Sequence, residues 1–109
     1  MVDNKYKIVL SKKFRDQIKI IVEYYEREGG KQTSKKARQS ILLSIKSLMF
    51  FPKRKPKLEL PNPLPYEVRI TKVWSYKIIY RVIEERKEVR ILTVRHDKES
   101  PDKLEKDLK

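Results

Sequence analysis

The stretch from Tyr66 to Asp97, YEVRITKVWSYKIIYRVIEERKEVRILTVRHD, decides the fold, because apolar and basic residues alternate through most of it. Such alternation is typical of β-strands, whose successive side chains point to opposite faces of a sheet. The charged segment EERK at residues 84–87 interrupts the alternation. We therefore expect a turn there, with Ile83 paired to Glu88 across an antiparallel hairpin.

This register predicts a sheet with two different faces. One face is aromatic and aliphatic, with Tyr76, Ile78, Tyr80, Val82, Val89, Ile91 and Thr93. The other face is basic, with Lys77, Ile79, Arg81, Ile83, Arg90, Leu92, Val94 and His96. We expect helices to cover the first face and a charged partner to meet the second. A slip of one residue would exchange the faces of one strand.

Composition bounds the kind of protein. A chain of 109 residues is one domain, spanning residues 1–109. Its 28 Lys and Arg residues against 15 Asp and Glu residues give a net charge of +13, which attracts polyanions such as nucleic acid, a ribosome or an acidic protein. No signal peptide or apolar run of about 20 residues is present, so we expect a cytoplasmic protein with no membrane partner.

Two absences narrow the chemistry. The chain has no cysteine and a single histidine. Disulfides, thiolate metal sites and multi-histidine metal sites are therefore excluded, and we expect no metal or other cofactor.

The N-terminal half predicts a strand followed by a helical hairpin. Tyr6–Leu10 alternates like a strand, and Ser11 is the expected N-cap of a helix running to about Glu28. Gly29-Gly30 ends this helix. A second helix, capped by Thr33 or Ser34, ends before Pro52. Apolar residues at helical spacing predict the buried stripes of the two helices, with Phe14, Ile18, Ile21, Val22 and Tyr25 in the first and Ala37, Ile41, Ile45 and Leu48 in the second.

The segment Phe51–Pro65 holds five of the six prolines and a cluster of cations at Lys53, Arg54, Lys55 and Lys57. We expect an irregular connection, in which Leu58–Leu60 is a short edge strand at most. The cations either reach phosphates or are an ordinary solvated charge run. After His96, Ser100 caps a short helix that begins at Pro101.

These elements predict a single α+β domain, with the N-terminal helical hairpin packed on a mostly antiparallel sheet of about four strands. The order resembles the RelE/ParE superfamily of type II toxin-antitoxin toxins. The resemblance rests mainly on YKIIYRV at residues 76–82, followed by VRILTV and His96. It also rests on YKIV before Ser11, on VEYY at residues 22–25, and on Ile45, Leu48 and Pro52 at the end of the second helix.

The resemblance implies a toxin that arrests growth and is held inactive by a cognate antitoxin. We expect RelE-like cleavage of ribosome-bound mRNA. ParE-like inhibition of DNA gyrase without chemistry is an alternative, favoured by the long first helix and by the closing spacing of His96, Ser100, Pro101 and Leu104. A basic nucleic-acid-binding module is a third class. The basic face suits a flexible acidic segment of the antitoxin.

Metal-independent RNA cleavage needs a proton-transfer group and cations around the phosphate. The predicted catalytic residues are Lys77, Arg81 and His96. Lys77 stands where RelE-like nucleases carry Arg, and Asp97 follows His96 where they carry a basic residue. The predicted RNA-binding residues are Arg69, Arg90 and Arg95. The alternative is a solvated sheet face, with His96 only hydrogen-bonding at the end of the sheet. Tyr76 and Tyr80 are expected in the core, and Trp74 is either a core-edge residue or an exposed contact.

Overall fold

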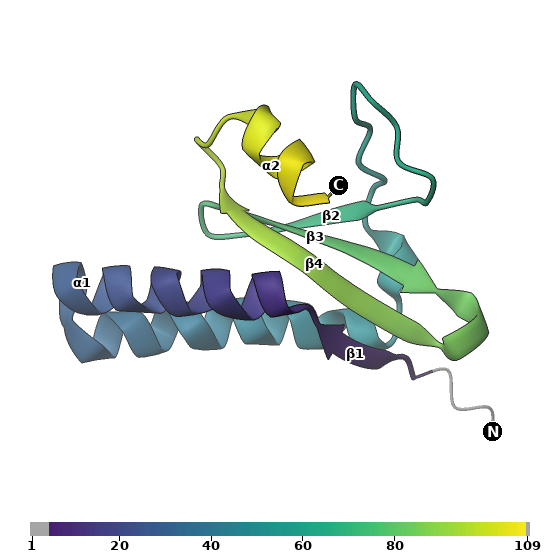
Figure 1. Ribbon diagram of the computed structural model, residues 1–109. Helices are drawn as coiled ribbons and strands as arrows, with labels where there is room; N and C mark the ends of the chain where they lie inside the picture. The colour runs from purple at the N-terminus through teal and green to yellow at the C-terminus, as the bar shows by residue number, and fades with distance from the viewer. Residues whose placement is uncertain (1–4, 109) are drawn as a thin grey trace.

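The computed structural model describes residues 5–108 and has the expected α+β architecture, with helices on both faces of one four-stranded sheet (Figure 1). The strand order in the sheet is β1-β4-β3-β2. The elements in chain order are β1 (Lys7–Leu10), α1 (Lys12–Lys46), the 3₁₀ turns η1 (Ser47–Met49) and η2 (Pro52–Arg54), β2 (Arg69–Val73), β3 (Tyr76–Ile83), the 3₁₀ turn η3 (Glu84–Arg86), β4 (Glu88–His96) and α2 (Pro101–Leu108).

The predicted helical hairpin is present as α1. Gly30, with φ 82° and ψ 176°, breaks α1 into two arms that run back along each other (Figure 1). Ser11 is the N-cap of the first arm, because its Oγ accepts a hydrogen bond from the Phe14 amide at 3.0 Å. The expected cap of the second arm is wrong. The Thr33 and Ser34 hydroxyls donate to backbone carbonyls instead, since Gly30 alone reverses the chain and the second arm begins at once.

The sheet is mixed. The turn after β3 sets the predicted register, with Ile83 paired to Glu88, and β2, β3 and β4 are antiparallel. In contrast, β1 pairs with β4 in parallel, with Ile8 opposite Val89. Along the chain, the whole helical hairpin separates β1 from the other strands. Two parallel strands need a long crossover connection of this kind.

The predicted faces of β4 are wrong beyond Ile91. Tyr80 pairs with Ile91 but Ile79 pairs with Thr93, so Leu92 is an extra residue in a β-bulge. The side chains that follow exchange faces as a result. Thr93 lies on the α2 side of the sheet, whereas Val94 packs in the core under the hairpin.

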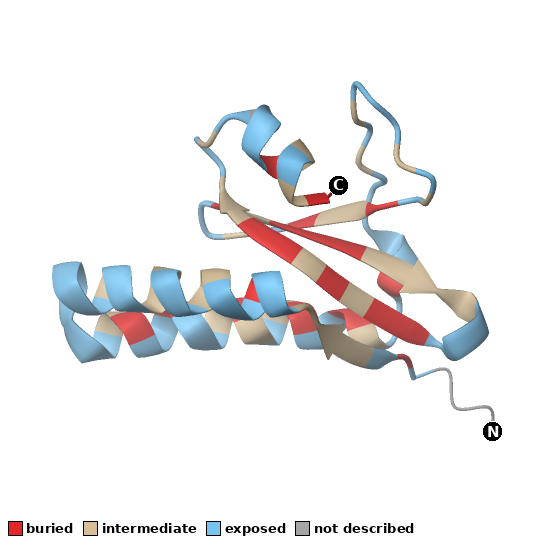
Figure 2. Ribbon diagram, viewed as in Figure 1, coloured by how far each residue is buried: buried red, intermediate tan, exposed pale blue. Residues whose placement is uncertain are grey.

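Two hydrophobic clusters hold the layers together, one on each face of the sheet (Figure 2). The larger cluster lies between the hairpin and the sheet and contains Phe14, Ile41, Ile45, Leu48, Tyr76, Ile78, Tyr80, Val89, Ile91 and Val94. The smaller one joins α2 to the other face through Val68, Ile79, Leu104 and Leu108. The face that we expected to be open to a charged partner is therefore partly covered by α2.

The connection from Phe51 to Pro65 is irregular, as predicted. Leu58–Leu60 is not a strand, because the single β-bridge in this segment joins Lys57 to Arg69. Ser100 Oγ accepts from the Asp102 amide at 3.2 Å and so caps α2 as expected. Within residues 5–108, no helix has the length and apolar character needed to cross a membrane.

Candidate functional site

The strand register brings together four of the predicted functional cations on the α2 side of the sheet. Lys77 lies opposite Arg95, and Arg81 lies opposite Arg90, on adjacent strands β3 and β4. Arg69 does not join them. It pairs with Tyr80 and points to the hairpin side, where its Nη1 donates to the carbonyls of Lys53 and Lys55. Arg69 therefore anchors the connection that follows α1.

Three of these four cations form ion pairs with carboxylates. Lys77 Nζ lies 3.6 Å from Asp97 Oδ1, and Arg90 Nη2 lies 3.0 Å from Glu88 Oε2. Arg95 makes the strongest pair, with Asp107 on α2, at 2.6 and 2.8 Å. The hydrogen bonds that the guanidinium donates to Asp107 raise the pKa of Arg95. Cations held in this way are less available to a phosphate than free ones.

The Asp107 carboxylate is the centre of this network. Its side chain is only 6% exposed. Burial pushes the pKa of Asp107 upward, but hydrogen bonds from Arg95, Thr93 and Gln17 outweigh burial and lower the pKa to about 2. Asp107 thus stays ionised and ties α2 to β4 and to the first arm of α1.

Arg81 is different, because it has no ion pair within the part of the chain that the structure describes. Its Cζ lies 4.2 Å from the centroid of the Tyr66 ring, close enough for a cation–π contact. Its Nε is buried without a hydrogen-bond partner. Arg81 is the cation of this face with spare hydrogen-bonding capacity.

His96 does not share the face of Lys77 and Arg81, so that expectation is wrong. The bulge at Leu92 places His96 opposite Tyr76, and its ring meets the Tyr76 ring edge-on with centroids 5.3 Å apart. His96 Nδ1 accepts a hydrogen bond from the Lys98 amide at 3.0 Å. The catalytic role of His96 remains a prediction, as do those of Lys77 and Arg81.

Sequence patterns missed an aromatic groove on the hairpin side. This aromatic groove, about 500 Å³ in volume, lies between the first arm of α1 and the ends of β3 and β4. We define it by the side chains of Ile20, Tyr24, Tyr25, Tyr76 and His96. Tyr25 and Tyr76 were expected as core residues. Tyr76 is buried in the larger cluster and Tyr25 packs against that cluster, but both also line this groove. The sequence does contain one indication of this groove. Ile20 and Tyr24 are large side chains that lie outside the predicted buried stripe of the helix.

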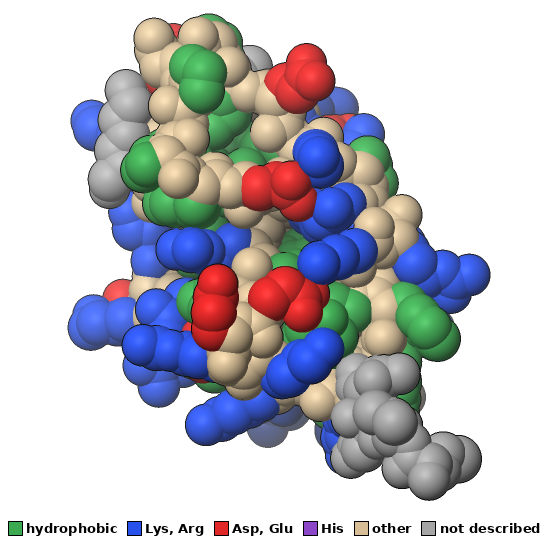
Figure 3. All heavy atoms as spheres, turned by 90° about the vertical axis from the view of Figure 1, so that its right-hand side faces the viewer, with side chains coloured by type: hydrophobic (Ala, Val, Ile, Leu, Met, Phe, Trp, Pro, Cys, Tyr) green, Lys and Arg blue, Asp and Glu red, His purple; other side chains and the backbone are tan. Residues whose placement is uncertain are grey.

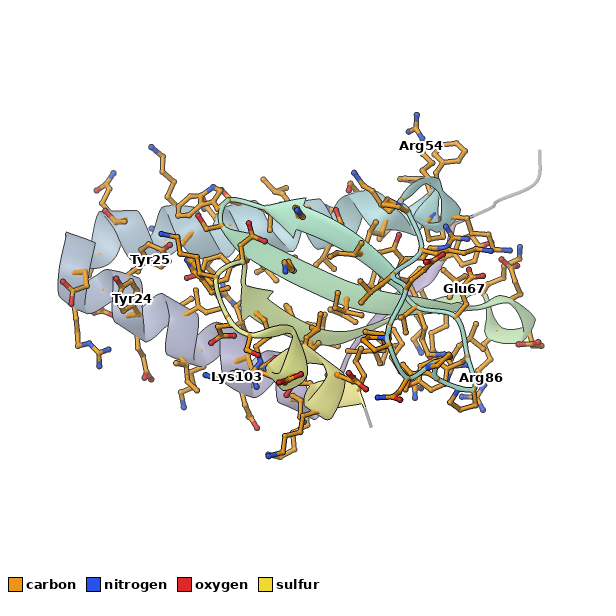
Figure 4. All side chains as sticks on the ribbon, turned by 90° about the horizontal axis from the view of Figure 1, so that it is seen from above. Tyr24, Tyr25, Arg54, Glu67, Arg86 and Lys103 are labelled. Carbon is orange, nitrogen blue, oxygen red and sulfur yellow. The ribbon has the colours of Figure 1, made fainter. Side chains whose placement is uncertain are left out.

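The rings of the aromatic groove contact one another. Tyr25 meets Tyr24 and Trp74 edge-on, with centroids 5.3 and 5.6 Å apart. The Tyr76 hydroxyl donates to the Tyr25 hydroxyl at 3.4 Å, and burial together with this contact raises the pKa of Tyr76. Figure 4 shows Tyr24 and Tyr25 side by side on the first arm. Trp74 is 47% exposed and has a positive φ of 54°, so it is an exposed contact at the β2–β3 turn.

Both sites lack a metal-binding cluster. Among the described residues, no group of three or more His, Cys, Asp or Glu side chains lies close enough to hold a metal ion.

Comparisons with known proteins agree on the fold. The chain resembles a solved structure of the chromosomal ParDE toxin-antitoxin system of P. aeruginosa, with a TM-score of 0.69 and 22% identity over 86% of this chain and 98% of that one. It also resembles the RelBE2 complex of Mycobacterium tuberculosis (TM-score 0.60, 17% identity, 84% and 91% covered). A third match is the isolated RelE toxin of E. coli (TM-score 0.58, 16% identity, 93% and 94% covered). No curated protein sequence matches the chain.

A family model decides the assignment. Residues 8–101 match the model described as the ParE toxin of the type II toxin-antitoxin system parDE, which covers most of the chain. The predicted RelE/ParE resemblance is therefore confirmed. The chain belongs to the ParE toxin family of type II toxin-antitoxin systems.

Proposed function

We propose that this toxin arrests growth by binding DNA gyrase, without cleaving RNA. The observation that supports the proposal is the separation of two predicted catalytic residues, His96 and Arg81. His96 packs against Tyr76 on the hairpin side, whereas Arg81 stacks on Tyr66 on the α2 side. A nuclease needs its proton-transfer group and its cations around one phosphate.

The test is to induce the toxin alone and to measure the incorporation of labelled thymidine and labelled methionine over time. We expect DNA synthesis to stop first, and purified toxin to inhibit supercoiling by gyrase. Early arrest of translation while DNA synthesis continues would refute the gyrase target.

Cleavage of ribosome-bound mRNA is the second candidate, because one hollow brings three of the predicted residues together. This hollow of about 210 Å³ lies at the ends of β3 and β4 and is lined by Lys77, Arg95 and His96, among others. There His96 would exchange a proton with the attacking 2′-hydroxyl or the leaving oxygen, and the cations would offset the phosphate charge. Primer extension on mRNA from translating ribosomes tests this candidate, and we expect no toxin-dependent ends.

We further propose that a cognate antitoxin covers the aromatic groove. The basic face is partly covered by α2, whereas the groove leaves Ile20 64% and Tyr24 47% exposed. Arg27 lies along the same groove, whereas the other cation there, Arg95, is already paired with Asp107 and Glu99. This combination suits an amphipathic acidic segment, with apolar side chains against the rings and a carboxylate at Arg27.

The antitoxin is the product expected from the adjacent reading frame. Co-purification with a tagged toxin tests the site, using Tyr24→Ala and Ile20→Ala as variants. Leu43→Ala is the matched control, since Leu43 is 65% exposed on the second arm and does not line the groove. We expect the two groove variants to weaken the complex and the control to leave it intact. Equal retention of all three would place the antitoxin elsewhere.

A further inference from the structure

The loop between α1 and η2 presents two consecutive phenylalanines to solvent. Phe50 is 55% exposed and Phe51 is 64% exposed. Neither ring belongs to either hydrophobic cluster. Neighbouring exposed rings of this size are unusual on a free protein surface and mark an interaction site more often than scattered apolar residues do.

Cations surround the two rings. A hollow of about 420 Å³ is lined by what we call the basic aromatic patch, namely Tyr6, Phe50, Phe51, Pro52, Lys53, Arg54 and Lys87. The patch lies at the end of the molecule where β3 turns into β4. Figure 3 views this end, and Lys and Arg side chains outnumber the acidic ones on it.

The patch carries excess positive charge after its internal pairs are counted. The Glu84 carboxylate forms ion pairs with both Lys53 Nζ, at 2.7 Å, and Lys87 Nζ, at 3.5 Å. Arg54 has no ion pair within residues 5–108, and its guanidinium lies 5.5 Å from the centroid of the Phe51 ring. Figure 4 shows Arg54 projecting away from the body of the molecule. One carboxylate therefore faces three cations.

The backbone under the patch is held firmly, so the rings are presented on a fixed support. The buried Tyr80 hydroxyl donates to the Pro52 carbonyl. Arg69 Nη1 donates to the carbonyls of Lys53 at 3.1 Å and Lys55 at 2.6 Å. A preordered surface loses less conformational entropy when it binds a partner.

We propose that the basic aromatic patch binds a single strand of nucleic acid, whose bases stack on Phe50 and Phe51 and whose phosphates contact Arg54, Lys53 and Lys87. Flat rings beside cations are the combination that single-strand-binding proteins use. An acidic peptide is less well matched, because its carboxylates could pair with the cations but it offers no row of planar bases to stack on Phe50 and Phe51. Among the residues that the structure describes, no Asn, Gln, Ser or Thr lines the hollow to read the sugar, so DNA and RNA strands should bind alike.

The test is fluorescence anisotropy with the full chain and a labelled oligothymidylate of about 20 nucleotides, long enough for a typical single-strand site. Phe51→Ala should weaken binding about tenfold, by loss of one stacking surface. Arg54→Ala should weaken binding and lower the slope of log affinity against log salt by about 1. Phe51→Tyr keeps a flat ring and should bind like the wild type.

The matched controls are Leu43→Ala, of similar exposure to Phe51, and Lys103→Ala, an exposed cation on α2. Figure 4 shows Lys103 on the opposite side of the molecule from Arg54. Both controls should bind within about twofold of the wild type, because a lone surface charge contributes little. Oligouridylate should match oligothymidylate, and a duplex of the same length should bind more weakly because its bases are not free to stack.

Three results would overturn the proposal. The first is unchanged binding by Phe51→Ala. The second is an equal loss in all variants, which would mean a general response to the net charge. The third is polyglutamate binding that depends on Phe51, which would assign the patch to an acidic protein partner. The assay contains neither gyrase nor ribosomes, so its outcome is independent of the proposed target.

Discussion

Arg95 on β4 donates two hydrogen bonds to the carboxylate of Asp107 on α2, from Nε to Oδ2 at 2.6 Å and from Nη2 to Oδ1 at 2.8 Å. Gln17 on the first arm of α1 donates to the same carboxylate from Nε2 at 3.2 Å. Arg95, which we predicted to contact RNA, is thus part of a structural link in which the Asp107 carboxylate joins β4, α2 and α1.

This link predicts a loss of stability in acid. The pKa of Asp107 is about 2 in the folded protein against an ordinary 3.8, so its contribution is complete above the ordinary value and is lost as the pH falls through about 2. The shift corresponds to roughly 2 kcal/mol of unfolding free energy. Urea unfolding from pH 5 to pH 2 measures it, with Asp107→Asn as the comparison. The difference between wild type and variant should shrink as the pH falls, and a constant difference would contradict the assignment.

Gly30 should be irreplaceable at the tip of the hairpin. Its φ of 82° and ψ of 176° lie in a region that only glycine adopts readily, although a Cβ there would meet no atom within 4 Å. Gly30→Ala should therefore lower the unfolding free energy by about 1 to 3 kcal/mol through backbone strain alone. Lys31→Ala, one residue further and helical, is the control and should be close to neutral. A neutral Gly30→Ala variant would mean that the turn relaxes.

Tyr80→Phe should loosen the support of the basic aromatic patch. The Tyr80 hydroxyl is buried, burial raises its pKa to about 12, and it donates to the Pro52 carbonyl. Removing it leaves that carbonyl without a donor, at a cost of about 1 to 3 kcal/mol. We expect a lower melting temperature and faster amide exchange at Arg54, whose amide donates to Phe51 O. Tyr24→Phe, on an exposed ring, should change neither measurement.

The double variant Lys77→Ala with His96→Ala separates the two candidate targets. If the toxin acts on gyrase without chemistry, growth arrest on induction should persist in this variant. If it cleaves mRNA, each lost group should lower the cleavage rate roughly 10²-fold or more, and growth should recover. Lys72→Ala, on the neighbouring strand and opposite Lys77, controls for loss of charge. Circular dichroism should confirm that all three proteins are folded, so recovery of growth by the double variant alone would refute the binding mechanism.

The sequence by itself determined the elements whose causes are local. The charged turn at residues 84–87 set the pairing of Ile83 with Glu88, because a short turn leaves the register little freedom. Ser11 capped the first arm. The apolar spacing selected the side that faces the core, where Phe14 is buried and Ile18, Ile21 and Tyr25 are partly buried, since such a stripe depends on residues within a few turns of the helix. The α+β architecture and the RelE/ParE resemblance followed from these elements.

Only the tertiary structure decided what lies on each face. The bulge at Leu92 looks like ordinary alternation in the sequence, yet it moves Thr93, Val94 and His96 to the opposite sides from those expected. Its surroundings are distant in the chain, since Gln17 Oε1 accepts from the Val94 amide at 3.0 Å and lies 2.8 Å from Thr93 Oγ1. The carboxylate partners of the arginines and the aromatic groove likewise arise from packing between elements. Periodicity along one segment carries no information about such contacts, which depend on where the other segments lie in space.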